Sequence, residues 1–128
     1  MPSDIAIPDF DEPLLAKAVE RLSPEEVDAL PFGAIRLDAE GTVRFYSDAE
    51  RRLSGYPKAA VGHKFFTEIA PCMNNAAFRG RIEQALDAGR LDIRFGFVGD
   101  FSSPATEVDV RVQSATSGGC WIFIRREG

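Results

Sequence analysis

The residues best suited to chemistry are one cysteine and a polar group that precedes it in the chain. Cys72 follows Pro71, and a proline fixes its own backbone and disfavours helix at the residue before it. We therefore expect a constrained loop to present the Cys72 thiol. Upstream, Tyr46, Glu50 and Ser54 supply a phenol, a carboxyl and a hydroxyl. Such groups could attach a ligand at one end and hydrogen-bond its other end, but composition alone does not bring them together.

Size and composition indicate one globular domain. The chain has 128 residues, of which 45% are hydrophobic and 10% aromatic, which is enough to bury a core. It holds no apolar run of about 18 residues, and its N-terminus lacks the basic and apolar regions of a signal peptide. We therefore expect a cytoplasmic protein that does not enter membranes. The two cysteines and one histidine give no metal-ligand spacing, and we expect both thiols to be unpaired.

The charge is unevenly distributed along the chain. Residues 1–30 carry eight acidic and two basic side chains, net −6, whereas the remainder carries net +1. We interpret residues 1–30 as an N-terminal helical cap that packs on a core of residues 31–128, although a solvated acidic helix pair would give the same pattern. The overall net charge of −5 argues against a nucleic-acid partner.

The first half of the chain predicts helices and then a hairpin. Residues 11–22 are predicted to be helical, because apolar side chains recur at helical spacing, at Leu14, Leu15, Ala18 and Leu22. Ser23-Pro24-Glu25-Glu26 has the sequence of a capping box with proline in the first turn and predicts a second helix. Residues 34–37 and 42–46 are predicted strands around a turn that ends in glycine.

The second half predicts one longer helix and three strands. The helix covers about residues 76–88, with an apolar face of Phe78, Ile82, Ala85 and Leu86. The strands follow from strict alternation at Leu91, Ile93, Phe95 and Phe97, at Val108, Val110 and Val112, and from residues 120–124. Such alternation is typical of a sheet with one covered face. We therefore predict an α+β fold with a five-stranded antiparallel sheet flanked by short helices.

Several motifs resemble the photoactive yellow protein family, which has the PAS fold. They are Pro31-Phe32-Gly33-Ala34-Ile35, Tyr46-Ser47-Asp48-Ala49-Glu50, Gly62 with Phe65-Phe66, Ile69-Ala70-Pro71-Cys72 and Cys120-Trp121-Ile122-Phe123-Ile124. The likeness covers essentially the whole chain. It implies a blue-light photoreceptor that signals by conformational change, is not an enzyme, and acts as a monomer or weak dimer on an unknown signalling protein.

The resemblance also implies a chromophore, p-coumaric acid, bound as a thioester to Cys72. Its phenolate would accept hydrogen bonds from Tyr46 and a protonated Glu50, with Ser54 supporting Tyr46. The expected binding residues are Cys72, Tyr46, Glu50, Ser54, Tyr56, Phe66, Ala70 and Phe97. In light, isomerisation would be followed by proton transfer from Glu50 and release of the N-terminal cap.

The roles of Tyr46 and Glu50 agree with physical expectation. An anion in a pocket without water needs hydrogen-bond donors that add no further charge. A carboxyl can be such a donor only while it is protonated. Desolvation and a neighbouring anion both raise a carboxyl pKa, so we expect Glu50 to remain neutral.

Two features depart from the family pattern. Tyr56 stands where well-known members carry an arginine that shields the chromophore, and the loop 98–104 is slightly shorter and lacks the phenylalanine and methionine that pack near the ring. We therefore expect slow recovery in the dark, or a mixture of protonated and ionised chromophore.

Plainer interpretations of single residues stay open. Cys72 alone is more typical of a small buried apolar side chain, and Ser47 with Glu50 fits a capping box in which the carboxyl binds only backbone. A Cys72–His63 nucleophile pair is conceivable, and Cys120 is expected to be inert. The alternative functions are a PAS module that binds a non-covalent ligand or a protein, and a small cysteine-dependent thioesterase or acyltransferase.

Overall fold

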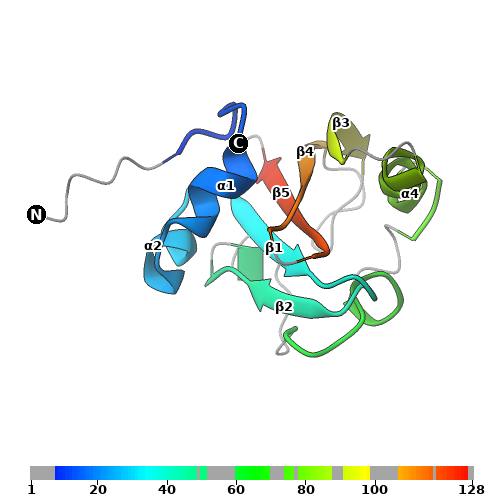
Figure 1. Cartoon of the computed structure of the whole chain (residues 1–128), viewed down its shortest axis with the longest axis horizontal. Helices are drawn as coiled ribbons and strands as arrows, with labels where there is room; N and C mark the ends of the chain where they lie inside the picture. Colours follow the sequence, from blue (N-terminus) through cyan, green and yellow to red (C-terminus); the bar gives the residue numbers. More distant parts are fainter. Residues whose placement is uncertain are drawn as a thin grey trace, which may run out of the picture.

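A single antiparallel sheet forms the centre of the molecule (Figure 1). The computed structural model describes residues 8–48, 50–51, 60–69, 74–76, 78–87, 91–98, 107–116 and 118–126. The elements are α1 (Leu15–Glu20), α2 (Pro24–Asp28), β1 (Gly33–Leu37), β2 (Val43–Tyr46), the π-helix η2 (Phe65–Ile69), α4 (Arg79–Asp87), β3 (Asp92–Val98), β4 (Glu107–Ser114) and β5 (Cys120–Arg126). The five strands lie in the order β2-β1-β5-β4-β3. The predicted α+β fold is therefore confirmed, including the hairpin of β1 and β2.

Each face of the sheet carries its own apolar cluster. In the register of β1 and β5, Ala34 pairs with Phe123 and Ile35 with Ile122, and successive strand residues point to opposite faces. Ala34 and Phe123 pack in the cluster of the N-terminal helices, whereas Ile35 and Ile122 pack in the cluster that also contains Ile82 of α4. Figure 1 shows α1 and α2 on one side of the sheet and α4 on the other.

The second covered face corrects the prediction of a sheet with one covered face. In β4, Val108, Val110 and Val112 are buried as expected. However, Arg111 and Gln113, which alternate with them, are also buried, with only 7% and 6% exposure. The alternation is still that of a sheet, but these polar side chains hydrogen-bond the N-terminal segment and do not face water.

The N-terminal helices are shorter than the periodicity predicts. α1 begins at Leu15, not at residue 11, and buries Leu15, Ala16 and Val19, whereas Leu14 is 58% exposed. The segment before α1 is held by β4, so its apolar periodicity does not continue a helix. α2 has the predicted capping box of Ser23 and Glu26. The division of the chain at residue 30 stays an interpretation.

Helix α4 covers the other face of the sheet and begins three residues later than predicted. The Asn75 side chain accepts the N–H of Phe78 at 3.0 Å, which caps the turn before Arg79. Phe78 and Ile82 are buried as expected and Ala85 packs against the cluster, but Leu86 is 54% exposed. Within the described ranges, none of the helices has the length and apolarity needed to span a bilayer.

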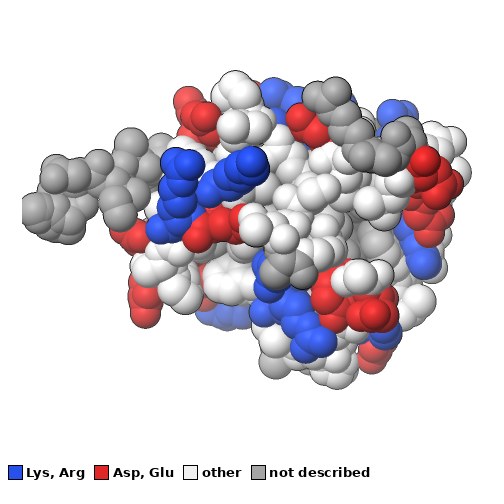
Figure 2. All heavy atoms as spheres, viewed as in Figure 1, with Lys and Arg blue, Asp and Glu red and all other residues white. Residues whose placement is uncertain are grey.

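The acidic N-terminal segment lies against arginines of the sheet. Arg94 of β3 pairs with Asp11 at 2.6 Å, and Arg125 of β5 lies 3.9 Å from the same carboxylate. Figure 2 shows acidic and basic side chains interspersed on the face in view. The uneven charge of the sequence is therefore offset in space, since acids near the N-terminus meet bases from the strands.

Candidate functional site

The predicted binding residues divide into two groups. Tyr46, Glu50, Phe66 and Phe97 are described by the structure, whereas Cys72, Ser54, Tyr56 and Ala70 lie outside the described residues. The described four come from four places in the chain: the end of β2, the turn after it, η2 and β3. The geometry of the site is built from these four.

Three of the four meet in one apolar cluster. Phe97 is 8% exposed and belongs to the cluster, and Tyr46 and Phe66 pack against it. Phe78 links the two phenylalanines, because its ring centroid lies 5.1 Å from that of Phe97 and 6.1 Å from that of Phe66, both edge-on. Helical spacing predicted Phe78 only as a core residue, and nothing in the sequence indicates this bridging position.

Glu50 is fully buried, with 0% exposure. Its carboxyl lies directly on the backbone of Gly33, where an added Cβ would be only 1.9 Å from Glu50 Oε1. Only glycine leaves room for the carboxyl at this place. Burial disfavours the charged form of a carboxyl, so this position suits a neutral Glu50. The sequence contains Gly33 within a family motif, but no pattern indicates that it makes room for Glu50.

The local structure at Ser47 decides the question of the capping box. The Ser47 hydroxyl oxygen accepts the N–H of Glu50 and the N–H of Ala34, each at 3.1 Å, so Ser47 is the N-cap of this turn. The return bond of a capping box needs the N–H of Ser47, which instead donates to Ala34 O at 2.9 Å. The Glu50 carboxyl is thus directed to the start of β1, where Gly33 lies.

A hydrogen bond joins the N-terminal segment to the same turn. The N–H of Asp48 donates to Asp28 Oδ1 at 2.8 Å, across 20 positions of sequence. Asp28 is the last residue of α2, and Asp48 lies two positions before Glu50. A change at Glu50 therefore has a direct mechanical connection to α2. Local sequence patterns could not predict a contact of this range.

The surroundings of Cys120 and His63 do not favour a reactive role for either side chain. Cys120 is free, and burial raises the pKa of its thiol to about 12, which agrees with an inert cysteine. His63 is exposed, with Nδ1 3.1 Å from Glu68 Oε1, as expected of a surface residue. Among the described residues, no group of three or more His, Cys, Asp or Glu could hold a metal ion.

A hollow of about 260 Å³ opens between the β1–β2 turn, η2 and α4. It shares Phe66 with the predicted site, but its lining includes none of Tyr46, Glu50 and Phe97. Of the expected chromophore-binding residues that the structure describes, Phe66 alone therefore lines this hollow.

Three known proteins resemble this chain in sequence or structure. The photoactive yellow protein of Rhodothalassium salexigens is 35% identical over 119 residues, which cover 91% of this chain and 95% of that relative. The photoactive yellow protein domain of the sensor histidine kinase Ppr from Rhodospirillum centenum matches with a TM-score of 0.77 at 42% identity, covering 87% of this chain and 99% of that domain. A PAS domain from Colwellia psychrerythraea matches with a TM-score of 0.60 at 13% identity, covering 80% of this chain and 92% of that domain, and supports the fold alone. No protein-family model matches the chain. The PAS-type fold is confirmed.

Proposed function

Because this chain belongs to the photoactive yellow protein family, we propose that it is a blue-light photoreceptor whose p-coumaric acid chromophore is bound as a thioester to Cys72. The observation that carries the chemical part of the proposal is the complete burial of Glu50 against Gly33. A carboxyl in such a place is neutral unless a charge compensates it, and a neutral carboxyl can donate a hydrogen bond to an anion.

In the dark, the residues of this chain would bind the chromophore and exclude water from it. Cys72 holds its acyl end, while the Tyr46 hydroxyl and the protonated Glu50 carboxyl donate to its phenolate oxygen. The bound group supplies the absorption of visible light and a double bond that can isomerise. Support for an apolar wall comes from Phe66 and Phe97, which share one cluster.

In light, Glu50 would give up its carboxyl proton to the phenolate oxygen. The carboxylate that remains has no access to water, since the side chain is 0% exposed, and moving a charge out of water costs free energy. The turn that carries Glu50 would relieve this cost by loosening. Because Asp28 binds the N–H of Asp48 in that turn, we infer that loosening weakens the attachment of α2 and releases the N-terminal segment.

Infrared difference spectroscopy tests the proton transfer. In the chromophore-bound protein, blue light should reversibly bleach the visible band and remove the signal of a protonated carboxyl. Glu50→Gln should abolish the carboxyl signal, and Glu25→Gln, which changes an exposed carboxyl, should retain it. A carboxyl signal and a light-induced opening that persist in Glu50→Gln would contradict the assignment. The absence of any visible band would favour a PAS module without a photocycle.

A further inference from the structure

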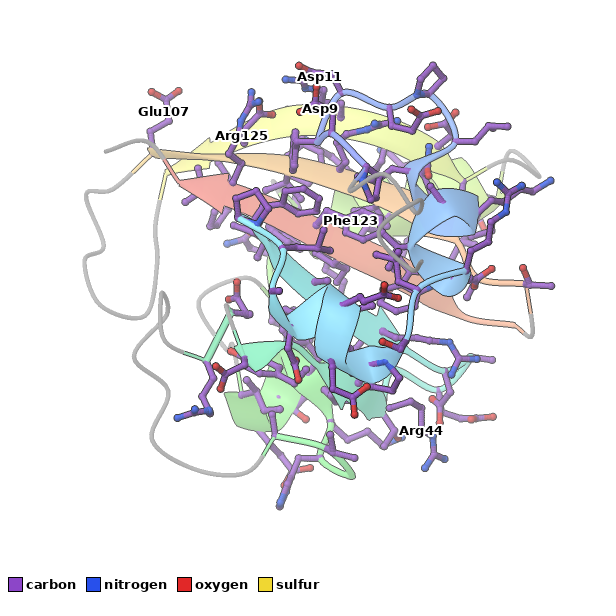
Figure 3. The ribbon with its side chains drawn as sticks, turned by 90° about the vertical axis from the view of Figure 1, so that its left-hand side faces the viewer. Asp9, Asp11, Arg44, Glu107, Phe123 and Arg125 are labelled. Atoms are coloured by element: carbon purple, nitrogen blue, oxygen red, sulfur yellow. The ribbon has the colours of Figure 1, made fainter. Side chains whose placement is uncertain are left out.

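A short acidic segment before α1, residues 9–13, crosses the strands on the face that carries α1 and α2; we call it the strap. Four side chains from three strands contact it and form what we call the cradle: Arg94 of β3, Arg111 and Gln113 of β4, and Arg125 of β5. Figure 3 shows Asp9 and Asp11 of the strap at the same edge as Arg125, far from Arg44.

The cradle binds the strap largely through its backbone. The Arg111 guanidinium donates to the carbonyl oxygens of Phe10, Glu12 and Pro13 at 2.9, 2.5 and 3.3 Å. Gln113 Nε2 also donates to Pro13 O, at 2.9 Å. Every peptide carries these carbonyl groups, so this part of the recognition does not depend on the side chains of the strap.

Two strap side chains add specificity. The Phe10 ring is 2% exposed and contacts two guanidinium groups, with its centroid 5.3 Å from Arg94 and 4.6 Å from Arg125. Asp11 pairs with Arg94 at 2.6 Å. The cradle thus suits an aromatic residue followed by acidic residues, since arginine binds both aromatic faces and carboxylates.

The cradle has a support that does not come from the strap. Asp109 of β4 binds Arg94 through both carboxylate oxygens, at 3.2 and 2.7 Å, and Arg125 at 2.8 Å. The hydrogen bonds from Arg94 outweigh the effect of partial burial and hold the pKa of Asp109 below its ordinary value. The Asp109 carboxylate therefore stays charged at neutral pH. The two guanidinium groups would therefore keep their places without the strap, and such preorganisation favours binding.

One donor of the cradle is not used by the strap. Arg125 Nε is buried and has no hydrogen-bond partner in the described part of the chain. A ligand with an acceptor at this point would make a bond that the strap does not make.

We propose that the cradle is a docking surface for a partner protein that presents an aromatic residue followed by acidic residues in an extended segment. The strap occupies this surface as an intramolecular competitor until the N-terminal segment is released. The release by light rests on the proposed function, whereas the recognition of the peptide does not.

Fluorescence anisotropy of a labelled peptide with the sequence of residues 8–20 tests the proposal on the full chain in the dark. Phe10→Ala with Asp11→Asn weakens the strap, so it should tighten binding of the free peptide by about tenfold or more, because the tethered competitor binds less well. The matched control combines Phe10→Ala with Asp9→Asn. Asp9 has no side-chain partner among the described residues, so this control should bind the peptide more weakly than the first variant.

Arg125→Ala in the strap-weakened protein should weaken binding, because it removes the guanidinium 4.6 Å from the Phe10 ring, whereas Arg44→Ala, which removes an exposed arginine paired with Asp38, should leave it unchanged. Equal binding in the wild type and the strap variants, or binding that Arg125→Ala leaves unchanged, would overturn the proposal. Dimer formation by the strap variants without peptide binding would also overturn it, in favour of a second copy as the occupant. Peptide binding without any response to light would contradict the proposed function alone.

Discussion

At the scale of single residues, the buried carboxyl of Glu50 depends on the missing side chain of Gly33. An alanine Cβ at Gly33 would lie 1.9 Å from Glu50 Oε1, a separation at which one of the two must move. We predict that Gly33→Ala lowers the free energy of unfolding by about 1–3 kcal/mol, as overpacking does. It should also shift the visible absorption of the chromophore-bound protein, because the hydrogen bond from Glu50 changes.

Gly80→Ala is the matched control for this prediction. At Gly80 an added Cβ would meet Ala76 Cβ at 3.5 Å, an ordinary contact, and alanine is the better helix former by about 1 kcal/mol. Urea unfolding and absorption spectra of both variants check the prediction. An unchanged spectrum in Gly33→Ala would show that the Glu50 carboxyl does not act on the chromophore.

The sequence identified Tyr46 and Glu50 as site residues through a family motif, but it could not reveal what surrounds them. On its spacing from Ser47 alone, Glu50 fitted a capping box better than a proton donor. The structure excludes the capping box, because the N–H of Ser47 donates to Ala34 O of β1. A local sequence pattern cannot predict such a contact between two elements. The same holds for Arg111, whose place in an alternating strand indicated a solvated side chain although the strap buries it.

At the scale of elements, the Glu20 carboxylate of α1 binds the β4–β5 hairpin, in addition to the hydrogen bond from the N–H of Ala16 to Gln113. Glu20 accepts the indole N–H of Trp121 at 2.9 Å and the N–H of Thr116 at 3.0 Å, together with the Thr116 hydroxyl. Burial raises the pKa of Glu20, but the hydrogen bonds from Thr116 and Trp121 outweigh it, and the net pKa lies below the ordinary 4.5. A lowered pKa means that docking favours the charged carboxylate.

We therefore predict that acid releases α1 from the hairpin. The stabilisation by Glu20 is fully present above its ordinary pKa of 4.5 and is lost as the pH falls through the lowered value in the docked state. Fluorescence of Trp121, the only tryptophan, should report this release. Glu20→Gln should weaken the acid dependence and Glu25→Gln should preserve it. Identical titrations of the wild type and Glu20→Gln would contradict the role of this carboxylate.

The β4–β5 turn gives a second test at this scale. Gly119 has φ 77, and an added Cβ would lie 1.9 Å from Leu37 O, whereas Gly118 has φ 102 with nothing within 4 Å of an added Cβ. Both substitutions by alanine strain the backbone, at about 1–2 kcal/mol, but only Gly119→Ala also clashes with β1. Urea unfolding should rank Gly119→Ala as clearly the less stable. Equal stabilities would mean that β1 and this turn can separate at little cost.

Periodicity predicted the type of each element and the succession of strands along the chain. It did not predict where the helices begin and end. α1 begins at Leu15 because the residues before it are held by Arg111 and Gln113 of β4, and no local signal carries that constraint. The packing of the N-terminal segment on the sheet likewise depends on contacts between residues about 100 positions apart.

At the scale of the whole molecule, light would act on two connected places. Glu50 lies in the turn that Asp28 binds. The strap precedes Asp28 in the same N-terminal segment and contacts Arg111. A loosening at the first place would lower the effective concentration of the strap at the second. This connection would turn a proton transfer into exposure of a surface.

The rate of return to the dark state stays a prediction at this scale. Tyr56 and residues 99–104 lie outside the described residues, so the expectation of slow recovery, or of a mixed chromophore population, rests on their types alone. Flash photolysis of the chromophore-bound protein measures the rate. A single yellow form that recovers as fast as typical family members would contradict the expectation.

The central claim is that Cys72 carries the chromophore, and intact-protein mass with an absorption spectrum tests it most directly. After treatment with p-coumaric anhydride, the wild type should gain the mass of one p-coumaroyl group and a visible band. Cys120→Ala should do the same, because that thiol is buried with a raised pKa, and Cys72→Ala should show neither change. An unmodified, colourless wild type, or a coloured adduct that survives in Cys72→Ala, would contradict the account.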